Sequence, residues 1–304
     1  FIGPSSEVIH NMGNKTVARD LARKSDVPLL RGSKGTLLNA GYARKMANII
    51  GYPVILKAAA GGGGRGMRVA KNEAEVERMY HMASNEAAKA FNNPDMFIEK
   101  YASRPRHIEF QILADKHGNM VHLGERDCSI QRKHQKLLEE SPSPALDDKL
   151  RKEMGEAAIN IARAAGYYSA GTVEFLLDAD RKFYFMEMNT RIQVEHPVTE
   201  LVTGIDLIEQ MIRIAQGEKL SFTQEQIEMK GHAIEFRINA EDVQSGFSPS
   251  LGTIEKTSWP EGDHIRIDTG VRDGSVITPY FDSMIAKLIV YGETREKALQ
   301  YSTN

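Results

Sequence analysis

Apolar positions along the chain follow two periods, one of a helix and one of a strand. Helical spacing predicts helices over 36–50, 73–91, 147–165 and 205–216. Short β-rich runs predict strands over 53–57, 67–70, 172–177, 182–189, 231–238 and 283–290. Strands joined by turns dominate over strict alternation of strand and helix, so the pattern predicts an α+β fold and not a doubly wound parallel sheet.

A run of glycines separates the first two predicted strands. Gly61, Gly63 and Gly66 satisfy the dinucleotide-binding pattern G-x-G-x-x-G, but that motif must open a helix, and here a strand follows. A Walker A loop is excluded because Met67 follows the last glycine, where that motif has Lys and then Ser or Thr. A surface turn and a loop that binds phosphate through backbone N–H groups both remain open. Lys57 favours the second, since an ammonium after an apolar strand needs an anionic partner.

Carboxylates mark the two strands of a predicted hairpin. The two-residue period of a strand places Glu174 on a face with apolar neighbours, and Glu187 and Asn189 together on a face of the next strand. If the strands pair, the two glutamates approach each other. Two carboxylates and an amide oxygen are ligands that suit Mg²⁺. The alternative is that each glutamate pairs with a basic residue at a sheet edge; the three residues together favour metal.

The polar alternation continues past the hairpin. Glu187, Asn189, Arg191, Gln193 and Glu195 keep one two-residue rhythm, which predicts that all five point the same way. A solvated edge strand is the alternative. An arginine fork, an amide and a carboxylate in this arrangement suit a small planar anion and a base beside a metal-bound phosphate.

Other residues carry weaker signals when taken singly. Lys15 lies near a helix start, and His107 begins a predicted strand. Arg237 shares a strand face with Glu235, so an internal salt bridge is its simplest explanation. Cys128, the only cysteine, is expected to be a buried filler, and a single cysteine favours a reducing compartment.

Composition narrows the class of protein. A net charge of −2 argues against nucleic-acid or anionic-membrane binding, and no apolar stretch approaches the roughly 20 residues of a membrane span. Because the chain starts at Phe1, carries no visible leader and stops in a charged, helix-like stretch, a piece of a longer protein is expected.

Longer strings in the sequence strongly resemble biotin carboxylases, which are ATP-grasp enzymes. They are MGNK, KAAAGGGGRGMRV, FIEKY, RHIEFQ, ERDCSIQRKHQK, GTVEF, FMEMNTRIQVEHPVTE, EFRINAED and PYFDSMIAKL. The string EMNTRIQVEHPVTE is specific to this family, whereas the glycine loop and the acidic pair are shared with the wider superfamily. The resemblance runs from the start to the last residues of the chain.

The resemblance implies an ATP site with bound Mg²⁺ or Mn²⁺. Lys15 and Lys57 would contact the ATP phosphates, and a glycine-rich lid would close over them. The glycines of this lid are Gly61, Gly62, Gly63, Gly64 and Gly66. The adenine and ribose side would be lined by Glu99, Lys100, His107, Gln131, His134 and Leu176. The implied metal ligands are Glu174, Glu187 and Asn189.

The resemblance also implies the chemistry, with biotin as carboxyl acceptor. Lys136, Arg191, Gln193 and the backbone of Val194 would bind bicarbonate, and Glu195 would deprotonate it. Bicarbonate would attack the γ-phosphate of ATP and give carboxyphosphate. Arg237 would stabilise the biotin enolate that accepts the carboxyl group, and the products would be N-carboxybiotin, ADP and phosphate.

The family pattern sets the expected organisation. Residues 1–29 would be a hinge, 30–102 a small lid subdomain, and 103–304 a larger antiparallel-sheet subdomain with the start of the C-terminal domain. Relative to the family the chain is truncated at both ends, and Ala60 stands where many relatives have glycine. Expected partners are biotin carboxyl carrier protein, carboxyltransferase subunits and a second copy in the full-length protein, in the cytoplasm.

Three functions are compared on these residues. The first is ATP-dependent biotin carboxylation for an acetyl-CoA, pyruvate, propionyl-CoA or related carboxylase. The second is a different ATP-grasp carboxylate ligase, against which the string from Arg191 to Glu195 argues. The third is a nucleotide-binding regulatory module without turnover. Four intact residues argue against it: Lys57, Glu174, Glu187 and Glu195.

Overall fold

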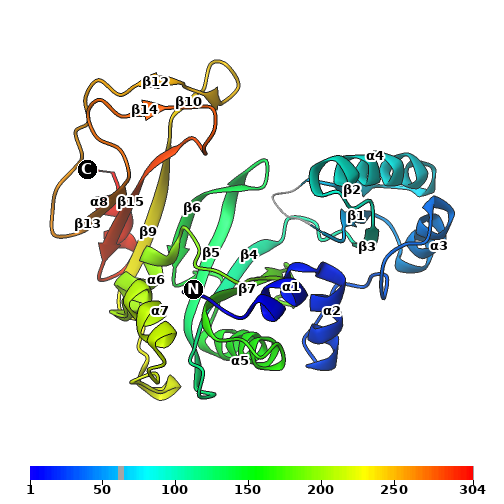
Figure 1. Ribbon diagram of the computed structural model, residues 1–304, viewed down its shortest axis with the longest axis horizontal. Coiled ribbons are helices and arrows are strands. Elements are labelled where there is room, and N and C mark those ends of the chain that lie inside the picture. Colours follow the sequence, from blue (N-terminus) through cyan, green and yellow to red (C-terminus); the bar gives the residue numbers. More distant parts are fainter. Residues whose placement is uncertain (61–64, 304) are drawn as a thin grey trace.

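The computed structural model describes residues 1–60 and 65–303 (Figure 1). Its helices are α1 Ser6–Gly13, α2 Lys15–Lys24, α3 Ala40–Ile50, α4 Glu73–Phe91, α5 Asp148–Ala164, α6 His196–Thr203, α7 Leu207–Gln216, the 3₁₀ helix η1 Gln224–Gln226 and α8 Arg295–Tyr301. Its strands are β1 Val54–Ala58, β2 Met67–Ala70, β3 Met96–Lys100, β4 Arg106–Ala114, β5 Met120–Arg132, β6 Gln135–Ser141, β7 Ser169–Leu177, β8 Phe183–Asn189, β9 His232–Asn239, β10 Glu241–Asp242, β11 Ser248–Pro249, β12 Gly252–Thr253, β13 Ile265–Thr269, β14 Val276–Ile277 and β15 Met284–Gly292.

Two antiparallel sheets carry the fold, as the α+β prediction requires. A three-stranded sheet has the order β2-β1-β3, and helices α3 and α4 pack against it. An eight-stranded sheet has the order β13-β15-β9-β6-β5-β4-β7-β8, and all of its pairs are antiparallel. Figure 1 shows the small sheet with its two helices beside the large sheet, at the opposite end from β13 and β15.

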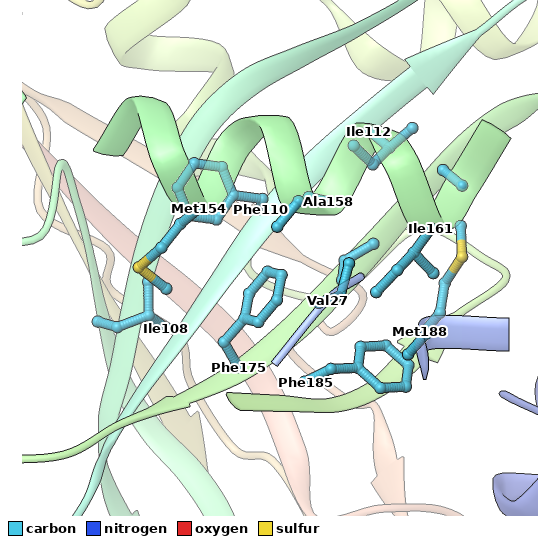
Figure 2. Packing of buried hydrophobic residues seen from close by; sticks show 14 of the residues in the cluster. Val27, Ile108, Phe110, Ile112, Met154, Ala158, Ile161, Phe175, Phe185 and Met188 are labelled. Carbon is cyan, nitrogen blue, oxygen red and sulfur yellow. The ribbon is translucent and has the colours of Figure 1, made fainter. Parts of the chain in front are cut away.

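Strand β4 shows how the large sheet is divided into an apolar face and a polar face. Ile108, Phe110 and Ile112 point toward helix α5 and enter the main core, which Figure 2 shows from close by. Alternate positions on the same strand, Glu109 and Gln111, are polar and yet fully buried. Burial of each large apolar side chain contributes about 1.5–3 kcal/mol, so the α5 face holds the sheet together. The opposite face is free to carry charge.

All ten predicted segments are present, with small shifts at their ends. The helix predicted from residue 36 begins only at Ala40, because the Asn39 side chain caps it by accepting from the Tyr42 amide at 2.8 Å. The helix predicted from residue 205 begins at Leu207, because Asp206 caps it in the same way. Among the described residues, no helix combines the length and apolar character needed to cross a bilayer.

Candidate active site

A cleft of about 910 Å³ opens between the small sheet and the polar face of the large sheet. The predicted site residues that line it are Lys15, Lys57, Glu99, Lys100, His107, Gln131, His134, Lys136, Glu174, Leu176, Glu187, Asn189, Arg191, Gln193, Val194, Glu195 and Arg237. Gly66 does not line the cleft. The other four predicted lid residues lie outside the described part of the chain; they are Gly61, Gly62, Gly63 and Gly64. Side chains far apart in the sequence therefore meet at one site.

Two lysines face the cleft near the small sheet. Lys15 is the first residue of α2, and the Asn14 side chain caps that helix by accepting from the Thr16 amide at 3.0 Å. The Lys15 ammonium lies 3.0 Å from Glu187. The Lys57 ammonium lies 2.8 Å from Glu99, so a carboxylate of the chain itself supplies the anionic partner for which the sequence pattern favoured phosphate. Both cations are thus held by a carboxylate at the wall of the cleft.

Two of the residues predicted for the adenine and ribose side, Glu99 and Lys100, are already engaged by the protein itself. Glu99 also binds Arg19. Burial raises the pKa of the Glu99 carboxyl group, but the charges of Lys57 and Arg19 more than offset burial, so that this pKa is lowered. The Lys100 ammonium donates to the carbonyl oxygens of Gly51 and Tyr52, at 3.1 and 2.6 Å. Glu99 and Lys100 therefore shape the wall of the cleft through contacts within the chain.

His107 connects this wall to the acidic strands. Its Nε2 lies 3.0 Å from Glu174, and its Nδ1 lies 2.9 Å from the Gln131 amide. Burial lowers the His107 pKa, but Glu174 overcomes that effect and raises it. The ring of His107 therefore bridges the Gln131 amide and the Glu174 carboxylate. His134 lies in the turn between β5 and β6 and is exposed.

The predicted approach of the two hairpin glutamates is confirmed. Glu174 on β7 and Glu187 on β8 are direct cross-strand partners. Glu174 is buried and accepts hydrogen bonds from Asn189 at 2.8 Å and Gln193 at 3.0 Å. Burial raises its pKa, but Lys136 and His107 outweigh burial and lower it to about 2, so the group stays ionised.

This donor set fits a hard divalent cation. Glu174 and Glu187 both line the cleft, and Asn189 lies beside them. Carboxylate and amide oxygens, completed by phosphate oxygens and water, are what Mg²⁺ prefers. Asn189 turns its NH₂ toward Glu174 and its oxygen toward Arg191, at 3.4 Å. The three predicted ligands are therefore close to each other, although each of them also contacts a cationic side chain of the chain itself.

The predicted strand over 182–189 is present, but the two-residue rhythm of polar residues does not continue as a strand to Glu195. Strand β8 ends at Asn189, the chain then bends, and Glu195 is the N-cap residue of α6. Pro197 lies in the first turn of that helix, where its fixed φ favours helix initiation over strand. Gln193 and Glu195 are nevertheless buried at the cleft, and the more exposed Arg191 donates to Gln193 at 2.6 Å.

Lys136 and Glu195 form the centre of the charge cluster. The Lys136 ammonium lies 2.6 Å from Glu195, 2.5 Å from Glu109 and 3.2 Å from Glu174. Burial lowers the Lys136 pKa, but the three carboxylates raise it by far more, so the ammonium stays charged. One lysine on β6 thus draws carboxylates from β4, β7 and the start of α6 to a single point.

Arg237 approaches Glu195 from the other side. The salt bridge expected with Glu235 is absent among the described contacts; the guanidinium instead donates to Glu139 at 2.7 Å and to Glu195 at 2.9 Å. Lys136 binds Oε1 of Glu195 and Arg237 binds Oε2. The Glu195 carboxylate is therefore clamped between two cations, with 1% of its surface exposed. The backbone carbonyl of Val194, next to it, accepts from Lys287 at 2.9 Å.

The sequence interpretation missed three charged residues behind this cluster. Arg126 is fully buried and donates to Glu109 at 2.6 Å and to Thr199 of α6 at 2.9 Å. Glu109 and Glu139 are equally buried. A charged residue inside an apolar strand indicates that its side chain is paired with an opposite charge. Such residues occur in RHIEFQ, GERDCS and KLLEES, so this signal could have found all three.

Cys128 has no part in this chemistry. Its thiol is buried, and burial raises its pKa well above the ordinary value. A buried neutral thiol is a poor nucleophile, so the prediction of a small core filler is confirmed.

Comparisons with known proteins place this cleft in a family. A family described as carbamoyl-phosphate synthase L chain, ATP binding domain, matches residues 14–223, and the biotin carboxylase C-terminal domain matches residues 235–304. Biotin carboxylase 1 of Bacillus subtilis is 55% identical over 98% of this chain and 67% of its own length. Biotin carboxylase 2, chloroplastic, of Populus trichocarpa is 55% identical over 99% of this chain.

A solved structure agrees with the fold. The biotin carboxylase domain dimer of Hydrogenobacter thermophilus 2-oxoglutarate carboxylase, in complex with MgADP, ADP and bicarbonate, has a TM-score of 0.97 and 52% identity. The match covers 99% of this chain and 67% of that one. The chain spans only 57% of the length of the poplar protein. With its antiparallel sheets and its clamped glutamate, the chain belongs to the biotin carboxylase family and has the ATP-grasp fold.

Proposed function

We propose that the complete protein carboxylates biotin, using ATP and bicarbonate, as the first half-reaction of a biotin-dependent carboxylase. The observation that carries this proposal is Glu195, a buried carboxylate clamped between Lys136 and Arg237 at the cleft. A carboxylate at the cleft can accept a proton from a small anion, and the two cations beside it attract that anion.

The ATP side of the cleft is assigned to Lys15 and Lys57. Both lysines line the cleft, and each ammonium group is paired with one carboxylate of the described chain. Each ammonium group therefore has further N–H donors that can bind phosphate oxygens. His107, Gln131, His134 and Leu176 would meet the adenine and ribose, with Glu99 and Lys100 as their wall. Glu174, Glu187 and Asn189 would hold Mg²⁺ or Mn²⁺, which would neutralise phosphate charge when bound with ATP. A lid at residues 61–66 stays a prediction.

The bicarbonate side is assigned to Lys136, Arg191, Gln193 and Val194. Glu195 takes the proton of bicarbonate, and a bicarbonate oxygen forms a bond to the γ-phosphorus of ATP as the bond to ADP breaks. The product is carboxyphosphate. The bond between the carboxyl carbon and the phosphate oxygen breaks, the departing phosphate takes the N–H proton of biotin, and the carboxyl carbon bonds to the ureido nitrogen. Arg237 donates to the enolate oxygen that biotin develops in this step.

Organisation, partners and compartment belong to the same proposal. We assign residues 30–102 to a lid subdomain, since the small sheet lies within them, residues 1–29 to a hinge, and 103–304 to the catalytic part. A biotin carboxyl carrier protein would deliver biotin, and carboxyltransferase subunits would use the product. The full-length protein would be a homodimer, like the biotin carboxylase domain of the Hydrogenobacter enzyme. The lone Cys128 favours a reducing compartment such as the cytoplasm.

The proposal is tested by following phosphate release from ATP by the full-length protein with free biotin. We expect release that requires bicarbonate and magnesium. Release that is the same with and without bicarbonate would assign the protein to another ATP-grasp reaction, and no release with ATP bound would favour a regulatory module.

A second test asks whether Arg237 acts in biotin carboxylation without contributing to ATP binding. Arg237→Ala is expected to lower biotin carboxylation by about 10²- to 10³-fold, because one charge-stabilising donor is removed. The dissociation constant for ATP should stay near that of the wild type, since the contacts of Arg237 are with Glu139 and Glu195 and not with the lysines of the ATP side. Arg213→Ala, on the exposed face of α7, is the control and should change neither quantity. Loss of ATP binding in Arg237→Ala would show that the residue is wrongly assigned.

A further inference from the structure

Two glutamates that the proposed reaction does not use face each other behind Arg237. Glu139 on β6 and Glu235 on β9 are direct cross-strand partners in the large sheet. Both side chains are fully buried. Like charges directly opposite each other on neighbouring strands destabilise a sheet, and burial removes the solvent that would screen them.

The hydrogen bonds of this pair are incomplete. Oε1 of Glu139 accepts from Arg237, but Oε2 has no donor within the described residues. Neither oxygen of Glu235 has a donor there. A buried carboxylate without donors loses its hydration and gains no hydrogen bond that replaces it. Burial therefore destabilises the ionised form, and such groups tend to bind a proton.

The cations near the pair are committed to other groups. Arg237 is shared with Glu195. Lys287 on β15 donates to the Val194 carbonyl at 2.9 Å and lies 3.3 Å from Asp268. Within the described residues, other groups that act on the pair include Glu195 at the start of α6, Glu109 on β4 and Cys128 on β5, and these three bring no positive charge.

Burial and the facing carboxylate act in the same direction on proton affinity. Burial first, and then the charge of Glu139, raise the pKa of Glu235 to about 9. Burial also raises the pKa of Glu139, to about 7, although Arg237 opposes it. One proton on the pair is thus favoured at neutral pH, and Glu235 is its preferred holder because Arg237 stabilises the charge on Glu139.

We propose that Glu235 is a neutral carboxylic acid that donates its O–H to Oε2 of Glu139, and that this pair, with one negative charge, positions Arg237 against Glu195. The shared proton supplies Oε2 of Glu139 with the donor it lacks and uses one of the two oxygens of Glu235. The guanidinium of Arg237 then has one negative charge behind it instead of two, so more of its positive charge acts on anions in the cleft. Ionisation of Glu235 would add a second negative charge behind Arg237 and weaken its hold on anions in the cleft.

Infrared spectroscopy of the full-length protein tests the proton directly, without reference to activity. The wild type should show the carbonyl stretching band of a protonated carboxyl group at neutral pH, and Glu235→Gln should lose it. Glutamine has the shape of the neutral acid, and its NH₂ can replace the O–H toward Glu139. If the two spectra carry the same band, or if neither carries it, Glu235 is ionised and the proposal is overturned.

Thermal unfolding against pH gives a second, independent readout. A buried acid whose pKa is raised stays protonated in the fold while the unfolded chain loses its proton, so stability falls as pH rises from about 4.5 to about 9. The Tm of Glu235→Gln should therefore rise relative to the wild type across this range. The neighbouring Glu140→Gln is the matched control, because its pKa is lowered despite burial by hydrogen bonds from His232 and Arg295. The Tm of Glu140→Gln should fall relative to the wild type as pH rises through the acid range. A Tm difference between Glu235→Gln and the wild type that does not change with pH would contradict the proposal.

The kinetic arm rests on the proposed function. In the wild type, kcat/KM for biotin carboxylation should decline toward pH 9, and in Glu235→Gln this decline should be absent or shifted to higher pH. An equal loss of kcat/KM at every pH would indicate a purely structural role and refute the positioning role. If the protein carboxylates no biotin at all, the proposed function fails, while the infrared and Tm results still decide whether the proton is present.

Discussion

Glu195→Gln is expected to lower the kcat of bicarbonate-dependent ATP cleavage by about 10²- to 10⁴-fold, the usual contribution of a positioned general base. Glutamine keeps the shape of glutamate and one acceptor oxygen for Lys136 or Arg237, but it cannot take up a proton. Bicarbonate that stays protonated is a weak nucleophile toward the γ-phosphorus. Because Glu195 binds Lys136 at 2.6 Å and Arg237 at 2.9 Å, its replacement removes one negative charge from beside both cations, which then attract anions more strongly. The KM for bicarbonate should accordingly change less than kcat.

The measurement compares phosphate release, with and without bicarbonate, in the variant and the wild type. Glu200→Gln is the control, since Glu200 lies on the same helix and binds Arg266 at 2.7 Å, away from Lys136. It should leave the bicarbonate dependence intact. A Glu195→Gln variant that keeps more than about a tenth of the wild-type rate would sink the assignment of Glu195 as base, because less than about 1.4 kcal/mol of barrier would then be at stake.

Arg126→Met is expected to lower the free energy of unfolding by about 3–5 kcal/mol, the loss typical of a broken buried ion pair. Methionine fills much of the volume but leaves Glu109 with the Lys136 ammonium as its nearest cation. It also removes the donor to Thr199, through which Arg126 fixes helix α6 to the sheet. Chemical denaturation of the full-length protein, with the slope compared between variants, gives the change in free energy.

A double variant measures how much of the lost stability comes from the interaction between Arg126 and Glu109. Glu109→Gln removes the carboxylate that Arg126→Met leaves behind, so the two changes together should cost less than the sum of each alone. Arg213→Met, which removes an exposed i,i+4 pair on α7, is the control and should alter stability little. Strict additivity of Arg126→Met and Glu109→Gln would mean that the two residues are not energetically coupled.

Local patterns were enough to predict the elements and part of the site. The two-residue period placed Glu174 and Glu187 on facing strands, and they are cross-strand partners. A lysine after an apolar strand needs an anion, and the anion beside Lys57 is Glu99 of the chain itself, so its contact with phosphate stays a prediction. The hairpin inference succeeds because it depends on the geometry of one hairpin, which is determined by nearby residues.

Inferences that needed long-range pairing were beyond the sequence pattern. The alternation through Arg191 and Glu195 looks the same in an extended strand and in a bend that leads to a helix. Arg237 was expected to pair with Glu235 on its own strand, but Glu139 on the next strand takes it. Which strand becomes the neighbour is decided by the packing of the whole sheet, and periodicity along one segment carries no information about it.

The position of β9 between β6 and β15 has a consequence for the nascent chain. Arg237 lies on β9, so the polypeptide must be synthesised well beyond Glu195 before that carboxylate can gain its second cation. A ribosome-bound chain that ends before residue 232 holds Glu139 and Glu195 without Arg237, and β6 still has an open edge. We expect such a chain to bury the α5 core first and to complete the charged cleft last. Protease digestion of chains stalled at successive lengths should therefore show protection around Phe110 before protection around Glu139.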